Sequence, residues 1–190
     1  CYDKAKIELD ELKDFAKKLD NIDDFKPWDQ SYYFTKLQKE KFDIDPEMLR
    51  PYFKAENVIK GIFEVANKMY GIEFNELNNI DTWHEEVTTY EVLNEDKSLV
   101  GLIYIDLHPR PTKRSGAWMN SIKDNGIYKG KVRRPHVQFT ANLTRSTEDK
   151  PALLTFSEVE TVFHEFGHCL HGLLSDCKYS TIGNTNVKWD

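Results

Sequence analysis

The feature that most constrains this chain is a pair of histidines four residues apart, His164 and His168. They lie in a stretch that begins with Thr155 and Glu158, which have the spacing of a capping box, and in which apolar residues recur with helical periodicity through Leu174. Residues four apart lie one turn above each other on nearly the same helix face, so both imidazoles can bind one ion. The sequence therefore predicts a long helix with a metal-binding face.

Glu165 directly follows the first histidine and is rotated about 100° from it around the helix axis. This rotation places the carboxylate at the edge of the metal-binding face, near a metal-bound water. Two neutral imidazoles suit Zn²⁺, and an adjacent carboxylate is the general base that hydrolysis needs. We therefore predict that His164 and His168 are zinc ligands and that Glu165 is a catalytic base. The alternative is an ordinary buried helix with two hydrogen-bonded histidines.

The same helix offers no obvious third ligand. His171 lies close to the face of His164 but roughly 10 Å further along the helix axis, too far to share an ion with it. The alternative third ligand within this chain is Glu160, one turn before His164. With Ser157, Glu160 also fits a second register of the capping box. Gly167 costs about 1 kcal/mol relative to Ala in a helix interior. Its presence suggests that another backbone, of protein or substrate, passes close to it.

The rest of the chain changes from helical to extended patterns. Three early stretches have the apolar spacing of amphipathic helices, and three later ones are rich in β-branched and aromatic residues. We expect a mainly α-helical fold with a small β-sheet beside the helix that bears the histidines. No repeat or long Pro/Gly linker interrupts residues 1–190, so no internal domain boundary is expected. The predicted helices are 3–20, a stretch that follows Ser31 and ends at about Phe42, and 55–70. The predicted strands are 87–93, 99–107 and 137–143, the first two joined by a turn.

Two of these helices have a defined apolar face. In the first, the core residues are expected to be Leu12, Phe15 and Leu19. In the third, Gly71 is placed to end the helix. Its apolar stripe consists of Val58, Ile62, Val65 and Met69.

Charge and composition exclude several functional classes. The 26 basic and 32 acidic residues give a net charge of −6, opposite in sign to that of a protein that coats nucleic acid. No apolar run approaches the roughly 20 residues of a membrane-spanning helix.

The three cysteines, Cys1, Cys169 and Cys177, cannot all pair and indicate free thiols in a reducing compartment. With no signal peptide visible, a cytoplasmic location is expected. The Cys at position 1 and the abrupt end suggest a fragment of a longer chain, and the oligomeric state stays open.

A basic segment lies between the second and third predicted strands. Residues 108–134 contain eight basic residues and one acidic residue. This segment is either a solvated loop that packs against acidic helices or a loop that binds a carboxylate or phosphate. Arg110, Lys113 and Arg114 are the candidates for binding the C-terminal carboxylate of a substrate. A basic interaction module is a further alternative for the function of the chain.

Segments along nearly the whole chain resemble the thimet oligopeptidase and neurolysin family of zinc peptidases. The most specific match is the run from Phe163 to Leu173, followed by Gly183 to Val187 and by Asp190. The details look most like the bacterial peptidyl-dipeptidase branch. One departure is that this family usually has Ser-Gly-Thr where the chain has Gly183-Asn184-Thr185. The matching upstream segments are Pro27-Trp28-Asp29, Tyr32-Tyr33, Leu49-Arg50-Pro51-Tyr52-Phe53, Trp83-His84 and Lys113-Arg114-Ser115-Gly116-Ala117-Trp118.

This resemblance implies part of the zincin-type catalytic domain of a metalloprotease, a hydrolase that uses one Zn²⁺ to cleave short peptides as an oligopeptidase or peptidyl-dipeptidase. It assigns His164 and His168 as metal ligands and Glu165 as the base. The third zinc ligand of that family is a Glu, which would lie three residues beyond Asp190. Residues 1–190 alone are then expected to bind zinc weakly and to be inactive. A catalytically inactive helical binding scaffold of the same fold is the alternative.

One predicted strand is a candidate for substrate binding. Zinc peptidases commonly hold an extended substrate through main-chain hydrogen bonds to the edge of a strand beside the active-site helix. The nearest upstream strand is 137–142, so Val137, Phe139 and Ala141 are expected to bind substrate. The alternative is a buried central strand with no free edge.

Overall fold

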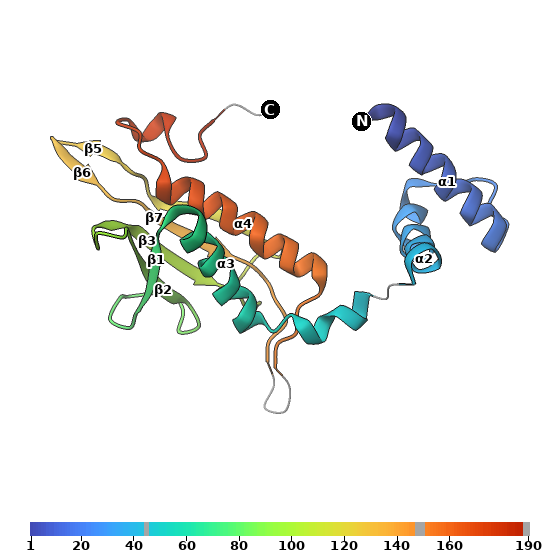
Figure 1. Cartoon of the computed structure of the whole chain (residues 1–190), viewed down its shortest axis with the longest axis horizontal. Helices are drawn as coiled ribbons and strands as arrows, with labels where there is room; N and C mark the ends of the chain where they lie inside the picture. Colours follow the sequence, from blue (N-terminus) through green and yellow to red (C-terminus); the bar gives the residue numbers. More distant parts are fainter. Residues whose placement is uncertain (44–45, 147–150, 188–190) are drawn as a thin grey trace. The chain divides into compact units, whose positions relative to one another are not determined.

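A computed structural model of the chain describes residues 1–43, 46–146 and 151–187. The chain divides into two compact units, Cys1–Met48 and Leu49–Asp190. The first unit is helical, whereas the second combines helices with a mixed β-sheet (Figure 1). Within the described residues, no helix is both long and apolar enough to cross a membrane.

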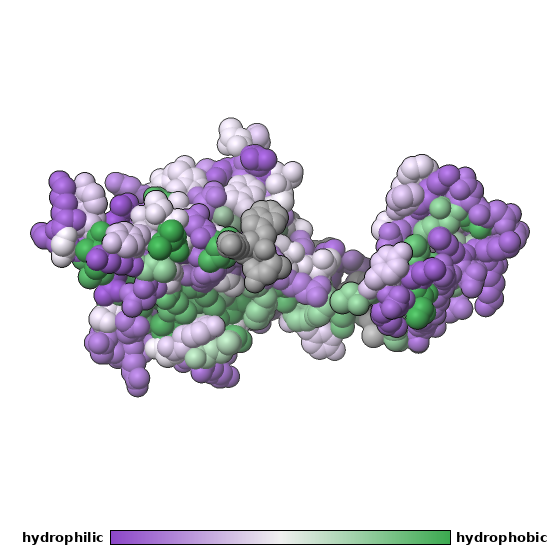
Figure 2. Space-filling model, turned by 90° about the horizontal axis from the view of Figure 1, so that it is seen from above, coloured by the Kyte–Doolittle hydropathy of each residue, from purple (hydrophilic) through white to green (hydrophobic). Residues whose placement is uncertain are grey.

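The first unit is a pair of helices, α1 (Tyr2–Asp20) and α2 (Gln30–Phe42), joined through the short helix η1 (Pro27–Asp29). Its small core contains Leu12, Phe15 and Ala16 of α1 and Tyr33 of α2. The prediction for Leu19 is wrong, because this side chain lies beyond the part of α1 that contributes to the core and is exposed. Hydrophobic residues are visible among hydrophilic ones on this unit (Figure 2), and its exposed aromatic residues include Tyr32, Phe34 and Phe42.

The second unit is built on a five-stranded sheet with the strand order β1-β2-β3-β7-β4. All pairs are antiparallel except β3 with β7, which is parallel. A separate two-stranded ribbon, β5–β6, follows β4. The predicted sheet beside the histidine helix is therefore confirmed, but it has more strands than the three expected. The strands are β1 (Glu73–Leu77), β2 (Thr88–Leu93), β3 (Leu99–Asp106), β4 (Trp118–Lys123), β5 (Gly126–Tyr128), β6 (Lys131–Arg133) and β7 (His136–Thr140).

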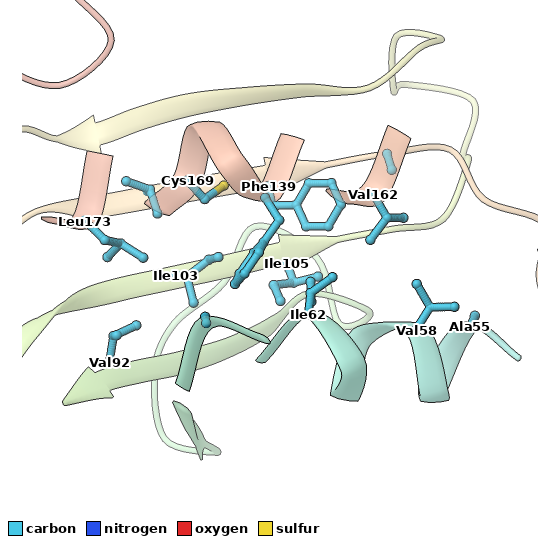
Figure 3. Close-up of a cluster of buried hydrophobic side chains, with 14 of the residues drawn as sticks. Ala55, Val58, Ile62, Val92, Ile103, Ile105, Phe139, Val162, Cys169 and Leu173 are labelled. Atoms are coloured by element: carbon cyan, nitrogen blue, oxygen red, sulfur yellow. The ribbon is translucent and has the colours of Figure 1, made fainter. Parts of the chain in front are cut away.

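Helices α3 (Ala55–Tyr70) and α4 (Phe156–Leu174) pack against the same face of this sheet (Figure 1). Helix α4 lies over β3, β7 and β4, and α3 lies beside it over β1. Phe63 of α3 joins the two helices, since its ring contacts those of Phe166 and Phe74. Figure 3 shows the core between these layers, where Ile103, Ile105 and Phe139 of the sheet point towards both helices. The short helices η2 (Pro46–Tyr52) and η3 (Ser180–Ile182) complete the fold.

The helix boundaries follow local sequence signals. Thr155 and Glu158 form the predicted capping box at the start of α4, with the Glu158 amide donating to the Thr155 hydroxyl. Gly71 ends α3 in the left-handed conformation, as expected. The apolar stripe of α3 is only half correct, because Val65 and Met69 are exposed and the buried positions are Ala55, Val58, Ile62 and Ala66.

Candidate metal centre

Helix α4 brings the two predicted zinc ligands together on its exposed side. The Nε2 atoms of His164 and His168 are 3.2 Å apart. Two nitrogens that each lie about 2.0–2.1 Å from one tetrahedral Zn²⁺ are roughly 3.3 Å apart, so this pair has the spacing that such an ion requires. The two rings are close to perpendicular, at 82°, and their Nε2 edges meet. The donor set and its spacing therefore fit one zinc ion.

Glu165 lies beside this pair and is half-buried. Together with His168 it lines a hollow of about 280 Å³ between α4 and the start of β4. The other walls come from the segment Ala117–Met119 and from Thr185. One carboxylate and one imidazole of the histidine pair thus face the start of β4 across a small hollow.

The described residues contain no group of three His, Cys, Asp or Glu side chains that could hold a metal ion. His171 is exposed on α4 and belongs to no such group, and Glu160 does not complete the site either. Asp190, from which the family resemblance places the third ligand, lies outside the described residues. The alternative in which Glu160 acts as a substitute ligand therefore has no support in the structure.

The prediction that strand 137–142 binds the substrate through a free edge is wrong. Strand β7 is paired on both sides, in parallel with β3 and antiparallel with β4, so it has no free edge. Val137, Phe139 and Ala141 are all buried in the core and cannot bind substrate. The edge strand on this side of the sheet is β4, where Asn120, Ser121 and Ile122 are exposed. Sequence reasoning missed β4 because its Asn, Ser and Lys residues have little strand preference.

Within the described residues, no protein backbone passes close to Gly167, whereas side chains pack tightly against Gly172. A Cβ atom on Gly167 would have no neighbour within 4 Å, whereas one on Gly172 would lie 2.9 Å from the Val137 Cγ1 and 2.7 Å from the Met119 Cε. The absence of a side chain at Gly172 lets α4 lie directly on β7 and β4. The thiol of Cys169 is buried in the same interface, where burial and the Glu165 carboxylate raise its pKa well above the ordinary value. This cysteine is therefore an inert core residue.

We expect opposite effects from substituting these two glycines. Gly172→Ala should lower the free energy of unfolding by about 1–3 kcal/mol, because the added methyl group overpacks the contact with Val137. Gly167→Ala should raise the free energy of unfolding by up to about 1 kcal/mol, because alanine has the higher helix propensity. Urea unfolding of the two variants measures the difference. Equal effects of the two changes would contradict this account of α4 packing.

The segment after α4 brings Thr185 to the site through Asn184. The backbone of Asn184 has a φ of 58°, the left-handed region that glycine and asparagine tolerate best. This conformation explains why asparagine can replace the glycine usual in the resembled family. The buried Asn184 side chain donates to the Asp124 carboxylate over 2.6 Å, and the backbone N–H of Asn184 donates to the Ser175 hydroxyl over 3.1 Å. These bonds hold the segment against the end of β4.

A buried charge cluster fixes the loop between β3 and β4. Asp106, whose side chain is 2% exposed, accepts two hydrogen bonds from the Arg110 guanidinium and one each from Lys113 and the Trp83 indole. Burial raises the pKa of the Asp106 carboxyl, but these donors outweigh it and hold the pKa well below the ordinary range. Lys113, 3% exposed, also donates to the Ala141 carbonyl over 2.5 Å. This cluster joins the ends of β3 and β7 to the loop that leads into β4.

These contacts correct the interpretation of the basic segment. Arg110 and Lys113 are internal partners of Asp106 and are therefore not available to a substrate carboxylate. Arg114 is exposed, and its main-chain carbonyl accepts a hydrogen bond from the Asn142 side-chain amide. The four-residue spacing from Asp106 to Arg110 was the sequence signal for this cluster, although the acid lies outside the basic segment.

Comparison with known proteins identifies the family. The model of Peptidase family M3 matches residues 2–190. Oligopeptidase A of Escherichia coli is 39% identical over 185 residues, which cover 96% of this chain and 27% of the relative. Dipeptidyl carboxypeptidase of the same organism is 36% identical over 166 residues, which cover 86% of this chain and 24% of the relative. A probable cytosolic oligopeptidase A of Arabidopsis thaliana is 36% identical over 198 residues, covering 100% and 28%. The chain thus spans about a quarter of the length of these relatives. A family match over almost every residue, together with the histidine pair on α4, makes this chain a member of peptidase family M3.

Proposed function

We propose that residues 1–190 are part of one zincin-type catalytic region of a longer, zinc-dependent peptidase. The observation that supports this most directly is the pair of imidazole nitrogens 3.2 Å apart beside a half-buried glutamate. The names of the relatives, oligopeptidase A and dipeptidyl carboxypeptidase, fit short peptides as substrates. Below, the full-length protein means a chain of the relatives' length that contains these residues.

In this proposal His164 and His168 hold the zinc ion, and a glutamate beyond Asp190 supplies the third protein ligand. When bound, Zn²⁺ lowers the pKa of a water molecule and polarises the peptide carbonyl. Glu165, at the edge of the hollow, accepts the proton of the attacking water and then delivers it to the leaving amine. Glu165 is half-buried and lines the same hollow as His168, which supports this role.

The substrate would lie along the outer edge of β4. The start of this strand is a wall of the hollow that also contains Glu165 and His168. Its other edge pairs with β7, so in the described residues one edge remains available for main-chain hydrogen bonds. Adding a strand to an exposed edge binds an extended peptide without requiring a particular side chain. This mode suits an enzyme that cleaves peptides of varied sequence.

A catalytically inactive binding scaffold is the second candidate function. It would keep α4 and the strand edge but would not need a carboxylate beside a metal-spaced histidine pair. The presence of both His residues and of Glu165 favours the enzyme. For the enzyme we also propose a cytoplasmic location, which is consistent with three cysteines that are free thiols.

Metal analysis tests the proposal. The full-length protein should contain about one zinc per chain and should lose peptide hydrolysis when a chelator removes it, with recovery when zinc is added back. Residues 1–190 alone should bind zinc far more weakly in calorimetry, since one of three protein ligands is missing. Hydrolysis that persists without metal would contradict the proposal, and nanomolar zinc binding by residues 1–190 would place the third ligand within them.

A further inference from the structure

The strongest unexplained feature outside the metal centre is a cluster of cationic side chains at one end of the sheet. It surrounds a shallow hollow of about 480 Å³ formed by the ribbon β5–β6 and by the ends of β4 and β7. Figure 1 shows this ribbon projecting from the end of the sheet. We call the cluster the basic patch. It consists of Lys123, Lys129, Lys131, Arg133 and Arg134, and it borders the imidazole of His136.

No acidic side chain among the described residues forms an ion pair with a member of the basic patch. The one acid in residues 123–136 is Asp124, and it accepts hydrogen bonds from Asn184 and Ser121 instead. Burial, together with the charges of Lys123 and Arg133, lowers the pKa of His136. The patch therefore concentrates positive charge in which none of the described Lys and Arg side chains forms a close ion pair, although the chain as a whole is acidic.

The basic patch lies at the far end of the strand proposed to bind substrate. Strand β4 begins at Trp118, beside Glu165 and His168, and ends at Lys123. Five steps of about 3.3–3.4 Å each separate these ends by roughly 17 Å. A peptide that pairs antiparallel with β4, the slightly more stable orientation, enters at Lys123 and runs towards Trp118. Residues about five or six positions upstream of the scissile bond then reach the basic patch.

We propose that the basic patch binds acidic side chains in the upstream part of the substrate, so that the enzyme prefers peptides with Asp or Glu about five or six residues before the cleaved bond. This inference rests on the proposed peptidase function and deepens it. Several exposed cations around a hollow suit flexible carboxylates at slightly different positions, whereas the acidic remainder of the chain disfavours a nucleic acid. Main-chain pairing along β4 would hold the peptide, and the patch would select its sequence.

Two peptides test this inference in the full-length protein. They have the same sequence except that the fifth and sixth residues before the scissile bond are Glu in one and the isosteric Gln in the other. We expect kcat/KM to be about three- to tenfold higher for the Glu peptide, the scale of a few exposed ion pairs. Raising the salt concentration should reduce this ratio, because exposed charges are screened.

A charge-reversed variant and a matched control locate the effect. In the double variant Lys131→Glu with Arg133→Glu, the ratio of kcat/KM for the Glu peptide to that for the Gln peptide should fall to one or below. Because both peptides are measured on the same variant, a general loss of activity cancels in this ratio. The control Lys6→Glu with Lys13→Glu makes the same change in net charge on exposed residues of α1 and should leave the ratio unchanged. Equal kcat/KM for the two peptides in the unaltered protein, or an equal loss of preference in the control, overturns the inference. If the unaltered full-length protein hydrolyses neither peptide, the proposed function is overturned together with the inference.

Discussion

Replacing Glu165 by Gln should lower peptide hydrolysis by the full-length protein by about two to four orders of magnitude while zinc stays bound. The amide is nearly isosteric with the carboxylate but cannot accept the proton of the attacking water, and general-base catalysis contributes about 10²- to 10⁴-fold. The metal should remain because His164 and His168, with their Nε2 atoms 3.2 Å apart, do not depend on Glu165 for their spacing. Zinc content and kcat measured on the same preparation check this expectation.

Two further variants give this experiment its controls. His168→Ala should lose both zinc and activity, because it removes one of the two nitrogens that define the site. Glu160→Gln makes the same chemical change five residues earlier in the helix, on an exposed side chain, and should keep both zinc and activity. Loss of zinc in Glu165→Gln would show that this residue is a ligand and would reverse the assigned roles.

Replacing Asp106 by Asn should lower the free energy of unfolding by about 3–5 kcal/mol. The change keeps the shape of the side chain but leaves the ammonium of Lys113, which is 3% exposed, and the Arg110 guanidinium without their buried counter-charge. The matched control is Glu73→Gln, which breaks the exposed ion pair with Lys97 and should change the free energy by less than about 1 kcal/mol. Urea unfolding of the full-length variants measures both, and similar small losses would contradict the role given to the cluster.

The same carboxylate predicts a dependence of stability on pH. Because its neighbours hold the pKa of Asp106 below the ordinary range in the folded protein, ionised Asp106 favours folding. This contribution is complete above the unfolded-state pKa of about 3.9 and declines as the pH falls below that value. The unaltered protein should therefore lose more stability between pH 6 and pH 3 than the Asp106→Asn variant. If the free energy of unfolding falls equally with pH in the two proteins, the ionisation of Asp106 does not contribute to stability.

The histidine-bearing helix α4 could be predicted from sequence because every signal for it is local. The capping box sets the first residue of α4, and a four-residue separation alone puts His164 and His168 on one face. The hairpin of β2 and β3 and the end of α3 at Gly71 are equally local. For such features the distance along the chain determines the distance in space, so no knowledge of packing is needed.

The substrate strand and the basic segment could not be assigned this way, because their roles depend on residues distant in sequence. Whether a strand has a free edge depends on its partners, and β7 has none because β3 pairs with one of its edges and β4 with the other. Lys113 became an internal residue through contacts with Asp106 and Ala141. The sequence by itself determined the helix that bears His164, Glu165 and His168, since helical periodicity fixes which side chains share a face. Only the tertiary structure decided that β4 borders the hollow and which cations remain exposed, because strand order and the burial of charge arise from pairing between distant segments.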